Sequence, residues 1–253
     1  MMNRREFFRR SLRVSAGAAA LTLDQQDARA TPAPAAGPLR VHRGNPRYFD
    51  DGSGKAVYLT GSHLGWELQD DAWGREHVFD YPRFLDFLAS HNHNLVRMWV
   101  VEHTRCEPAN RRAVATPMPY LRPGPGTALD GGPKFDLTQF NPEYFRRLRQ
   151  RVTAAGRRGI YVIVMLFQGF SVHTYRKRDP WFGHPMNRYN NVGGIDGDAN
   201  GDGDGREVHT LADPAITALQ EAYVRKVVDT VGDLDNVLYE IANEAGVYST
   251  DWQ

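Results

Sequence analysis

The stretch VLYEIANEAG, residues 237–246, places a carboxylate where it could do chemistry. It reads as a buried β-strand that stops at the pair Asn243-Glu244. A carboxylate at the mouth of an apolar strand is costly to desolvate unless something uses it. A carboxyl group in that place can give or take a proton, so Glu244 is a candidate for proton transfer. Two ordinary roles stay open for it, namely capping the next helix and pairing with a surface Arg.

Further polar and aromatic side chains stand at the ends of other apolar runs. They are His63, Trp66, Glu102, His103 and Gln168. Aromatic faces next to polar groups suit ligands that have both apolar faces and hydroxyl groups. Ordinary packing or a loop hydrogen bond is the alternative for each of them. We expect these side chains to lie near Glu244 if the runs form neighbouring parallel strands.

The chain alternates strand-like and helix-like segments. Four apolar, β-branched runs read as strands: 56–63, 94–103, 160–169 and 237–244. Residues 82–91 have helical spacing. Asn141-Pro142 and Asp213-Pro214 each predict an N-cap followed by proline at the first helical position. The order β-α-β-α-β-α-β predicts a parallel sheet with right-handed crossovers.

The lengths of the connections indicate which edge of the sheet carries a site. Helix-to-strand connections are tight, whereas the strand-to-helix connections 104–140 and 170–212 are long, and loops of that length are usually functional or disordered. A (β/α)8 barrel builds its site from loops at the carboxyl ends of the strands, where Glu244 lies. A doubly wound sheet would alternate in the same way, but GSHLGW after the first strand lacks a G-x-G-x-x-G turn. We therefore expect an α/β fold of the (β/α)8 TIM-barrel type.

Only about four βα units are present. A complete barrel needs eight, and typically about 250 residues for the barrel alone. We therefore expect residues 41–253 to be a partial TIM barrel, the N-terminal half.

The first 40 residues differ in character from the rest. Residues 1–30 have the paired arginines Arg4 and Arg5, a short apolar run, and a small-x-small pattern at Ala28-Arg29-Ala30. The run is too short to span a bilayer, and the pattern is typical of a twin-arginine-type signal peptide. An amphipathic N-terminal helix is the alternative. A Pro/Ala-rich linker would follow at 31–40, and the mature protein would be periplasmic or secreted.

Composition narrows the possible partners. Formal net charge is +1, and six of the 31 Lys and Arg residues lie in the first 30 positions. The remainder has no basic patch, so we expect no nucleic-acid partner and no membrane in the mature form. The single cysteine, Cys106, cannot form an internal disulfide.

Three stretches, LVRMW, YEIANE and NPRYFDDGSGKAVYLTGSHLGW, resemble the retaining (β/α)8 glycoside hydrolase superfamily, more narrowly its cellulase-like and apiosidase-like members. The resemblance covers roughly residues 40–253. It implies that Glu244 is the general acid/base, that Asn243 holds the sugar 2-hydroxyl, and that Arg97 orients the nucleophile. An oligo- or polysaccharide would be the substrate, no cofactor would be needed for catalysis, and the strand-end residues above would contact sugar.

Glycoside cleavage needs a second carboxyl group, about 5–5.5 Å from the first in retaining enzymes. Glu240 lies four residues before Glu244, roughly 13 Å away along a strand, which is too far. We expect Glu240 to pair with an inward basic group such as Arg97. Family members carry the nucleophile after strand seven, so it would lie beyond residue 253. The rival interpretation is a non-catalytic carbohydrate- or calcium-binding exported protein.

The segment DGDANGDGDGRE, residues 196–207, matches the EF-hand loop template. The predicted ligands are Asp196, Asp198, Asn200, Asp202, Asp204 and Glu207. Gly201 stands at the sharp turn, and oxygen ligands at this spacing suit Ca²⁺. No helix clearly precedes the loop, so we expect a structural calcium clip rather than a sensor. A solvated Asp/Gly turn is the alternative.

Overall fold

The computed structural model describes residues 33–72, 76–109, 113–175 and 178–246. The chain divides into two units, Met1–Thr31 and Pro32–Gln253, and the described residues belong to the second. The export signal predicted for residues 1–30 lies outside them. Within the described ranges, no helix is both long enough and apolar enough to cross a bilayer.

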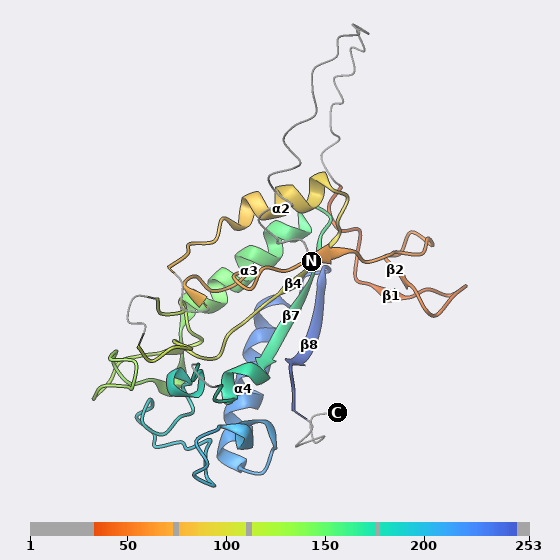
Figure 1. Ribbon diagram of the computed structural model, residues 1–253. Helices are drawn as coiled ribbons and strands as arrows, with labels where there is room; N and C mark the ends of the chain where they lie inside the picture. Colours follow the sequence, from red (N-terminus) through yellow and green to blue (C-terminus); the bar gives the residue numbers. More distant parts are fainter. Residues whose placement is uncertain (1–32, 73–75, 110–112, 176–177, 247–253) are drawn as a thin grey trace, which may run out of the picture. The chain divides into compact units, whose positions relative to one another are not determined.

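A four-stranded parallel sheet forms the centre of the second unit (Figure 1). In spatial order its strands are β3 (Gly61–Ser62), β4 (Leu95–Met98), β7 (Tyr161–Gln168) and β8 (Val237–Asn243). Spatial order is the same as chain order, and every neighbouring pair is parallel. The predicted mixed α/β fold with a parallel sheet is therefore confirmed.

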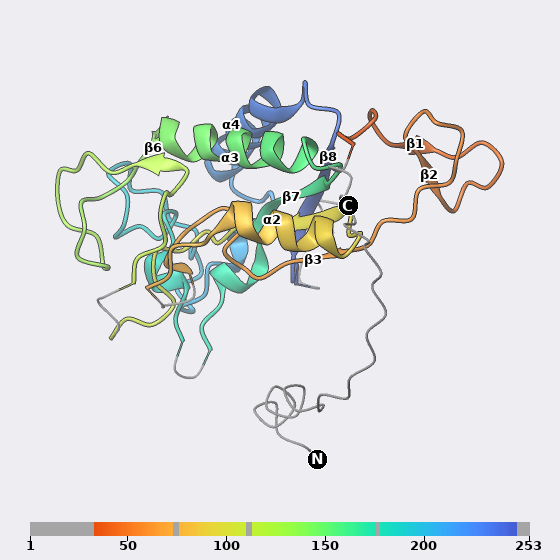
Figure 2. The same ribbon diagram turned by 90° about the horizontal axis from the view of Figure 1, so that it is seen from above.

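Three helices connect these strands. They are α2 (Tyr81–Ser90), α3 (Pro142–Gly156) and α4 (Pro214–Val231). Each begins at a side-chain N-cap: Asp80, Asn141 or Asp213 accepts a hydrogen bond from a first-turn N–H, with proline at the first or second helical position. Such caps satisfy donors that the helix itself leaves open. Helices α3 and α4 pack side by side along the sheet (Figures 1 and 2).

The two faces of the sheet differ in exposure. Val96 and Met98 on β4 are fully buried in a core that they share with α2, α3 and α4. Arg97, between them, points to the other face because side chains alternate along a strand. Strand β7 is buried almost throughout, whereas Tyr239 and Ile241 on the edge strand β8 are exposed.

Two small hairpins and several 3₁₀ turns complete the described fold. Strand β1 (Arg40–Val41) pairs with β2 (Phe49–Asp50), and β5 (Tyr120–Leu121) pairs with β6 (Asp136–Phe140), both antiparallel. The turns η2 (Gly169–Val172), η3 (Trp181–Gly183) and η4 (Arg206–His209) lie between β7 and α4.

The segment predicted as a linker contacts this unit. The Ala35 N–H donates to the Gly156 carbonyl at 2.9 Å, and the Tyr161 hydroxyl donates to the Gly37 carbonyl at 2.9 Å. These residues therefore pack on the fold instead of standing apart from it.

Candidate active site

The sheet has an open face, which we define by Arg97, Ile163, Leu238 and Glu240. Arg97 is in register with Ile163, and Ile163 with Leu238, so all three side chains share one side of the sheet. Glu240 lies two residues beyond Leu238 and points the same way. Each of these residues is only partly buried. The open face is therefore the side from which a ligand could reach the strands.

Arg97 connects β4 to β8 on the open face. Its Nε donates to Glu240 Oε2 at 2.6 Å, and Nη2 donates to the other carboxylate oxygen of Glu240. Nη2 also donates to Asn243 Oδ1 at 2.7 Å. The hydrogen bond that Arg97 donates to Glu240 raises the pKa of Arg97, and the charges of Glu67 and Glu244 add to that effect. The predicted Arg97–Glu240 pair is confirmed, and Glu240 is fully engaged by it.

Asn243 ends β8 next to the end of β7, and Glu244 follows it directly. Asn243 is in register with Gln168, and its Nδ2 donates to Gln168 Oε1 at 2.8 Å. Glu244 is exposed and has a φ of 49°, a left-handed conformation that is uncommon for a residue other than glycine. A methyl group at Gly169 would overlap the Glu244 carbonyl. The close approach of these two backbones therefore requires glycine at 169.

Aromatic rings lie on two sides of this strand end. His63 stacks on Trp99 with ring centroids 4.8 Å apart, and the Arg97 guanidinium lies 4.8 Å over the Trp99 ring. Across β7, Tyr175 stacks on Phe170 at 4.9 Å and is 40% exposed. Burial raises the pKa of Tyr175, and the charge of Glu244 raises it further. Glu244 is therefore close enough to both Arg97 and Tyr175 for its charge to act on them.

Four of the predicted sugar contacts have their side chains turned into the protein. Trp66 donates from Nε1 to the Ala72 carbonyl and packs against the core, while His103 and Gln168 are 1% and 0% exposed. Glu102 is also largely buried. His103 and Gln168 are too deeply buried in this conformation to contact a polysaccharide directly, whereas contact by the partly exposed Trp66 and Glu102 stays a prediction. The physical reason is that the long loops fold back over the ends of β4 and β7.

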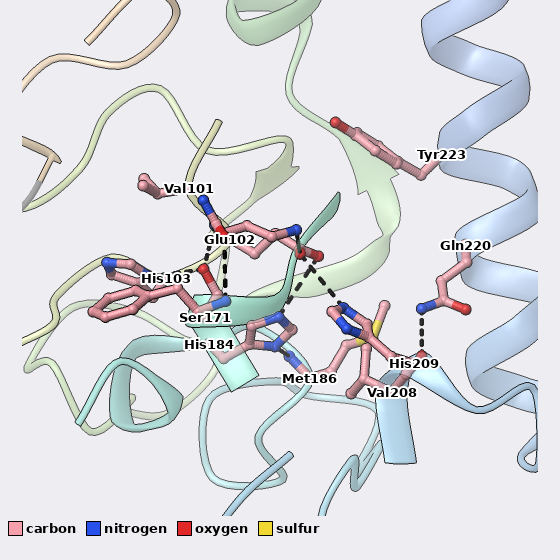
Figure 3. A network of polar contacts seen from close by, with 12 residues as sticks. Val101, Glu102, His103, Ser171, His184, Met186, Val208, His209, Gln220 and Tyr223 are labelled. Atoms are coloured by element: carbon pink, nitrogen blue, oxygen red, sulfur yellow. Dashed lines mark hydrogen bonds and ion pairs between the residues drawn. The ribbon is translucent and has the colours of Figure 1, made fainter. Parts of the chain in front are cut away.

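Glu102 binds the loop between β7 and α4 (Figure 3). Its Oε2 accepts from the Gln168 backbone N–H at 2.6 Å. Its two oxygens also face His184 Nε2 at 3.7 Å and His209 Nε2 at 3.8 Å, distances of charge contacts rather than hydrogen bonds. Burial acts to raise the pKa of Glu102, but the two histidines outweigh it and lower that pKa to about 2. Glu102 is therefore ionised across the pH range in which proteins are usually studied.

His103 lies in the same region and has a different partner. Its Nδ1 is 2.8 Å from the Ser171 hydroxyl, which also accepts from the Glu102 N–H at 3.1 Å. Burial lowers the pKa of His103 to about 3, so its ring is neutral near pH 7. This contact fixes η2 to the end of β4.

Sequence reasoning missed three residues of this region. Trp99 lies two residues after Arg97, and that spacing on one strand could have placed it on the open face. Glu67 is fully buried and accepts N–H bonds from Leu64, from Gly65 at 3.0 Å and from Trp99 at 3.3 Å, while burial raises its pKa. Nothing in the sequence signalled Tyr175, because its position depends on a long loop.

The acidic loop at 196–207 has part of the predicted calcium-binding form. Gly201 adopts φ 76°, as the sharp turn requires. Asp198 accepts backbone N–H bonds from Asp202 and Gly203, and Glu207 Oε2 is buried with no hydrogen-bond partner among the described residues. Asp204, however, faces Arg206 at 2.6 Å and Thr174. Among the described residues, no three acidic, His or Cys side chains are gathered as a metal would need, so the calcium site stays a prediction that requires Asp204 to turn.

We expect millimolar Ca²⁺ to raise the melting temperature of the protein, because a bound ion stabilises only the folded state. A chelator should reverse the rise, and Asp196→Ala should abolish it. Differential scanning fluorimetry with Mg²⁺ as the control ion measures this effect. An unchanged melting temperature at saturating Ca²⁺ would remove the site.

More than half of the chain matches a known protein family. Residues 101–248 match the family described as Domain of unknown function (DUF6298), and this is more than half of the chain. The chain belongs to that family. The matched region runs from the end of β4 through Asn243 and Glu244. No curated protein matches the chain.

One solved structure similar to the chain is a "putative glycoside hydrolase" from Bacteroides vulgatus. The two chains are 16% identical, and the TM-score is 0.46. The similarity covers 83% of this chain but 34% of the other, so this chain spans about a third of the length of that structure.

Proposed function

We propose that this chain is the N-terminal part of an exported, retaining (β/α)8 glycoside hydrolase. Glu244 would be its general acid/base, Asn243 would bind the sugar 2-hydroxyl, and Arg97 would set up a nucleophile from a later strand. The observation that carries the proposal is the 2.7 Å hydrogen bond from Arg97 to Asn243. These residues are far apart in the sequence, yet they meet beside Glu244 at the carboxyl end of the sheet.

The topology of the sheet supports the barrel. The four parallel strands follow one another in chain order, as strands do in a (β/α)8 barrel. In a doubly wound sheet the order reverses at a switch point, where the ligand binds. The described sheet has no such reversal, and the candidate residues lie at the carboxyl ends of its strands instead.

The backbone at Glu244 also supports a functional role. Its left-handed φ of 49° costs about 1–2 kcal/mol for a residue with a Cβ. Strain of this kind is concentrated at active and binding sites, where the surroundings hold it in place. Glycine at that position would relieve the strain, and a role for the glutamate side chain would explain why glutamate stands there.

The aromatic rings on the two sides of Glu244 fit a carbohydrate ligand. Sugar rings have apolar faces that stack on aromatic side chains, and hydroxyl groups that need polar partners. The His63–Trp99 pair and the Phe170–Tyr175 pair supply aromatic faces, and Arg97, Asn243 and Glu244 supply polar groups between them.

A non-catalytic carbohydrate-binding protein is the second candidate. It is favoured by Glu240, whose two carboxylate oxygens both bind Arg97, so that this carboxylate cannot serve as the second catalytic group. Such a protein would use the same rings and polar groups but would leave the glycosidic bond intact.

Binding and cleavage measured side by side separate these candidates. The protein would be expressed from its natural gene and screened against a panel of polysaccharides, by calorimetry for binding and by release of reducing ends for cleavage. The proposal predicts that at least one polysaccharide is both bound and cleaved. Binding without release would support the second candidate, and the absence of both would overturn the carbohydrate assignment.

A further inference from the structure

We infer that Gln168 is a positioning residue, which fixes the orientation of the Asn243 amide, and that Glu102 holds Gln168 in place. The inference rests on the proposed function, because Asn243 is there the group that binds the sugar 2-hydroxyl. It gives a fully buried glutamine and a largely buried glutamate a defined effect on the orientation of Asn243.

The hydrogen bonds around Asn243 can run in only one direction. Arg97 has donors and no acceptor, so the Asn243 atom that faces it must be Oδ1. Nδ2 is thereby directed to Gln168, whose Oε1 accepts it at 2.8 Å. An Asn243 amide turned by 180° would place a donor against Arg97 and an acceptor against an acceptor.

The Gln168 amide is fixed in the same way from its other side. Its Oε1 also accepts the Phe170 backbone N–H at 3.2 Å, and a backbone N–H can only donate. If the Gln168 amide were turned by 180°, its Nε2 would face two other donors, Asn243 Nδ2 and the Phe170 N–H. Arg97 and the Phe170 N–H therefore determine the orientation of both amides between them.

Gln168 keeps its amide at a cost. The side chain is fully buried, and its Nε2 has no hydrogen-bond partner among the described residues. A buried donor without a partner is unfavourable, and an apolar side chain of similar size would avoid it. Packing alone thus gives no reason for glutamine here, whereas an oxygen that accepts from both Asn243 and the Phe170 N–H does.

Glu102 holds the backbone from which Gln168 projects. Its carboxylate accepts the Gln168 N–H at 2.6 Å and lies against His184 and His209 (Figure 3). The Met186 N–H donates to His184 Nδ1 at 3.1 Å, which holds this ring within the loop. His184 directly follows η3 and His209 is the last residue of η4, so Glu102 joins the long loop to the last residue of β7.

A double-mutant cycle tests whether Gln168 acts through Asn243. The variants are Gln168→Met, Asn243→Ala and both together, in the full-length protein from its natural gene. We expect Gln168→Met to lower kcat/KM about tenfold in the wild-type background and less than about twofold in the Asn243→Ala background. Equal losses in both backgrounds would overturn the inference while leaving the proposed function intact.

Gln220→Met is the matched control. Gln220 is also a buried glutamine, 5% exposed, whose Nε2 donates to the Val208 carbonyl at 2.6 Å. This variant should lower the melting temperature without any coupling to Asn243. Gln168→Glu is the conservative variant, since it keeps an acceptor oxygen toward Asn243 and Phe170, and it should restore part of the lost activity.

A second readout does not depend on catalysis. In ¹⁵N NMR spectra, the side-chain amide signals of Asn243 are those lost in Asn243→Ala. They should move and exchange faster with water in Gln168→Met but not in Gln220→Met. If the wild type cleaves no glycoside, the proposed function fails, and this experiment still decides the inference: unchanged Asn243 signals in Gln168→Met would overturn it.

Discussion

Glu244→Gln is expected to lower kcat for glycoside hydrolysis about 10²–10⁴-fold, the usual contribution of a positioned acid/base. Glutamine keeps the size and hydrogen-bonding reach of the side chain but cannot protonate the leaving oxygen. Substrate binding should change little, so the loss should appear in kcat and not in KM. Steady-state kinetics of the protein from its natural gene, with its best polysaccharide, measure the effect.

The dependence on the leaving group makes this test specific. Acidic phenols leave an aryl glycoside as phenolates, without protonation. Formation of the glycosyl-enzyme from such substrates should therefore be far less affected than cleavage of the natural glycan. Glu221→Gln on α4 is the control, because that glutamate is 61% exposed and forms only an i,i+4 pair with Arg225. A uniform loss over all leaving groups, or a loss under about twofold, would contradict the acid/base assignment.

Glu102→Gln is expected to make the protein up to about 3 kcal/mol less stable at pH 7. The pKa of Glu102 is lowered in the folded protein to about 2, against about 4.3 in an unfolded chain. A lowered folded pKa means that the stabilisation is present above the unfolded pKa and is lost as pH falls toward the folded one. The difference in free energy of unfolding between wild type and variant should therefore be largest at pH 6–7 and should shrink as the pH falls from about 5 to about 2.

Urea unfolding at a series of pH values from 7 to 2 measures this difference. Glu107→Gln is the matched control, because Glu107 is a nearby, 43% exposed glutamate with one 3.6 Å contact to Arg178. It should change stability by less than about 1 kcal/mol. A difference between Glu102→Gln and wild type that stays constant with pH would show that folding does not lower the pKa of Glu102.

Local sequence signals predicted most of the regular structure. The Asn141-Pro142 and Asp213-Pro214 caps begin α3 and α4 at the expected residues, because capping depends on a few adjacent side chains. The pairing of Glu240 with Arg97 could also be predicted, since a charge inside a strand must find a partner. These features depend on short stretches or on the period of one strand.

The burial of the strand-end residues could not be predicted in the same way. Glu102 and His103 end an apolar run, which is where a barrel presents ligand contacts, but here they face inward. Their partners, His184, His209 and Ser171, come from a loop some 70–110 residues later in the chain. Strands of two residues, such as β1 and β5, were missed because they carry no measurable alternation.

The most direct test of the account is a crystal structure of the Glu244→Gln variant, from the natural gene, with an oligosaccharide bound. We predict that the side chain at position 244 lies within about 3 Å of a glycosidic oxygen. The 2-hydroxyl of the adjoining sugar should bond to Asn243. An oligosaccharide bound elsewhere, with the side chain at 244 directed into open water, would contradict it.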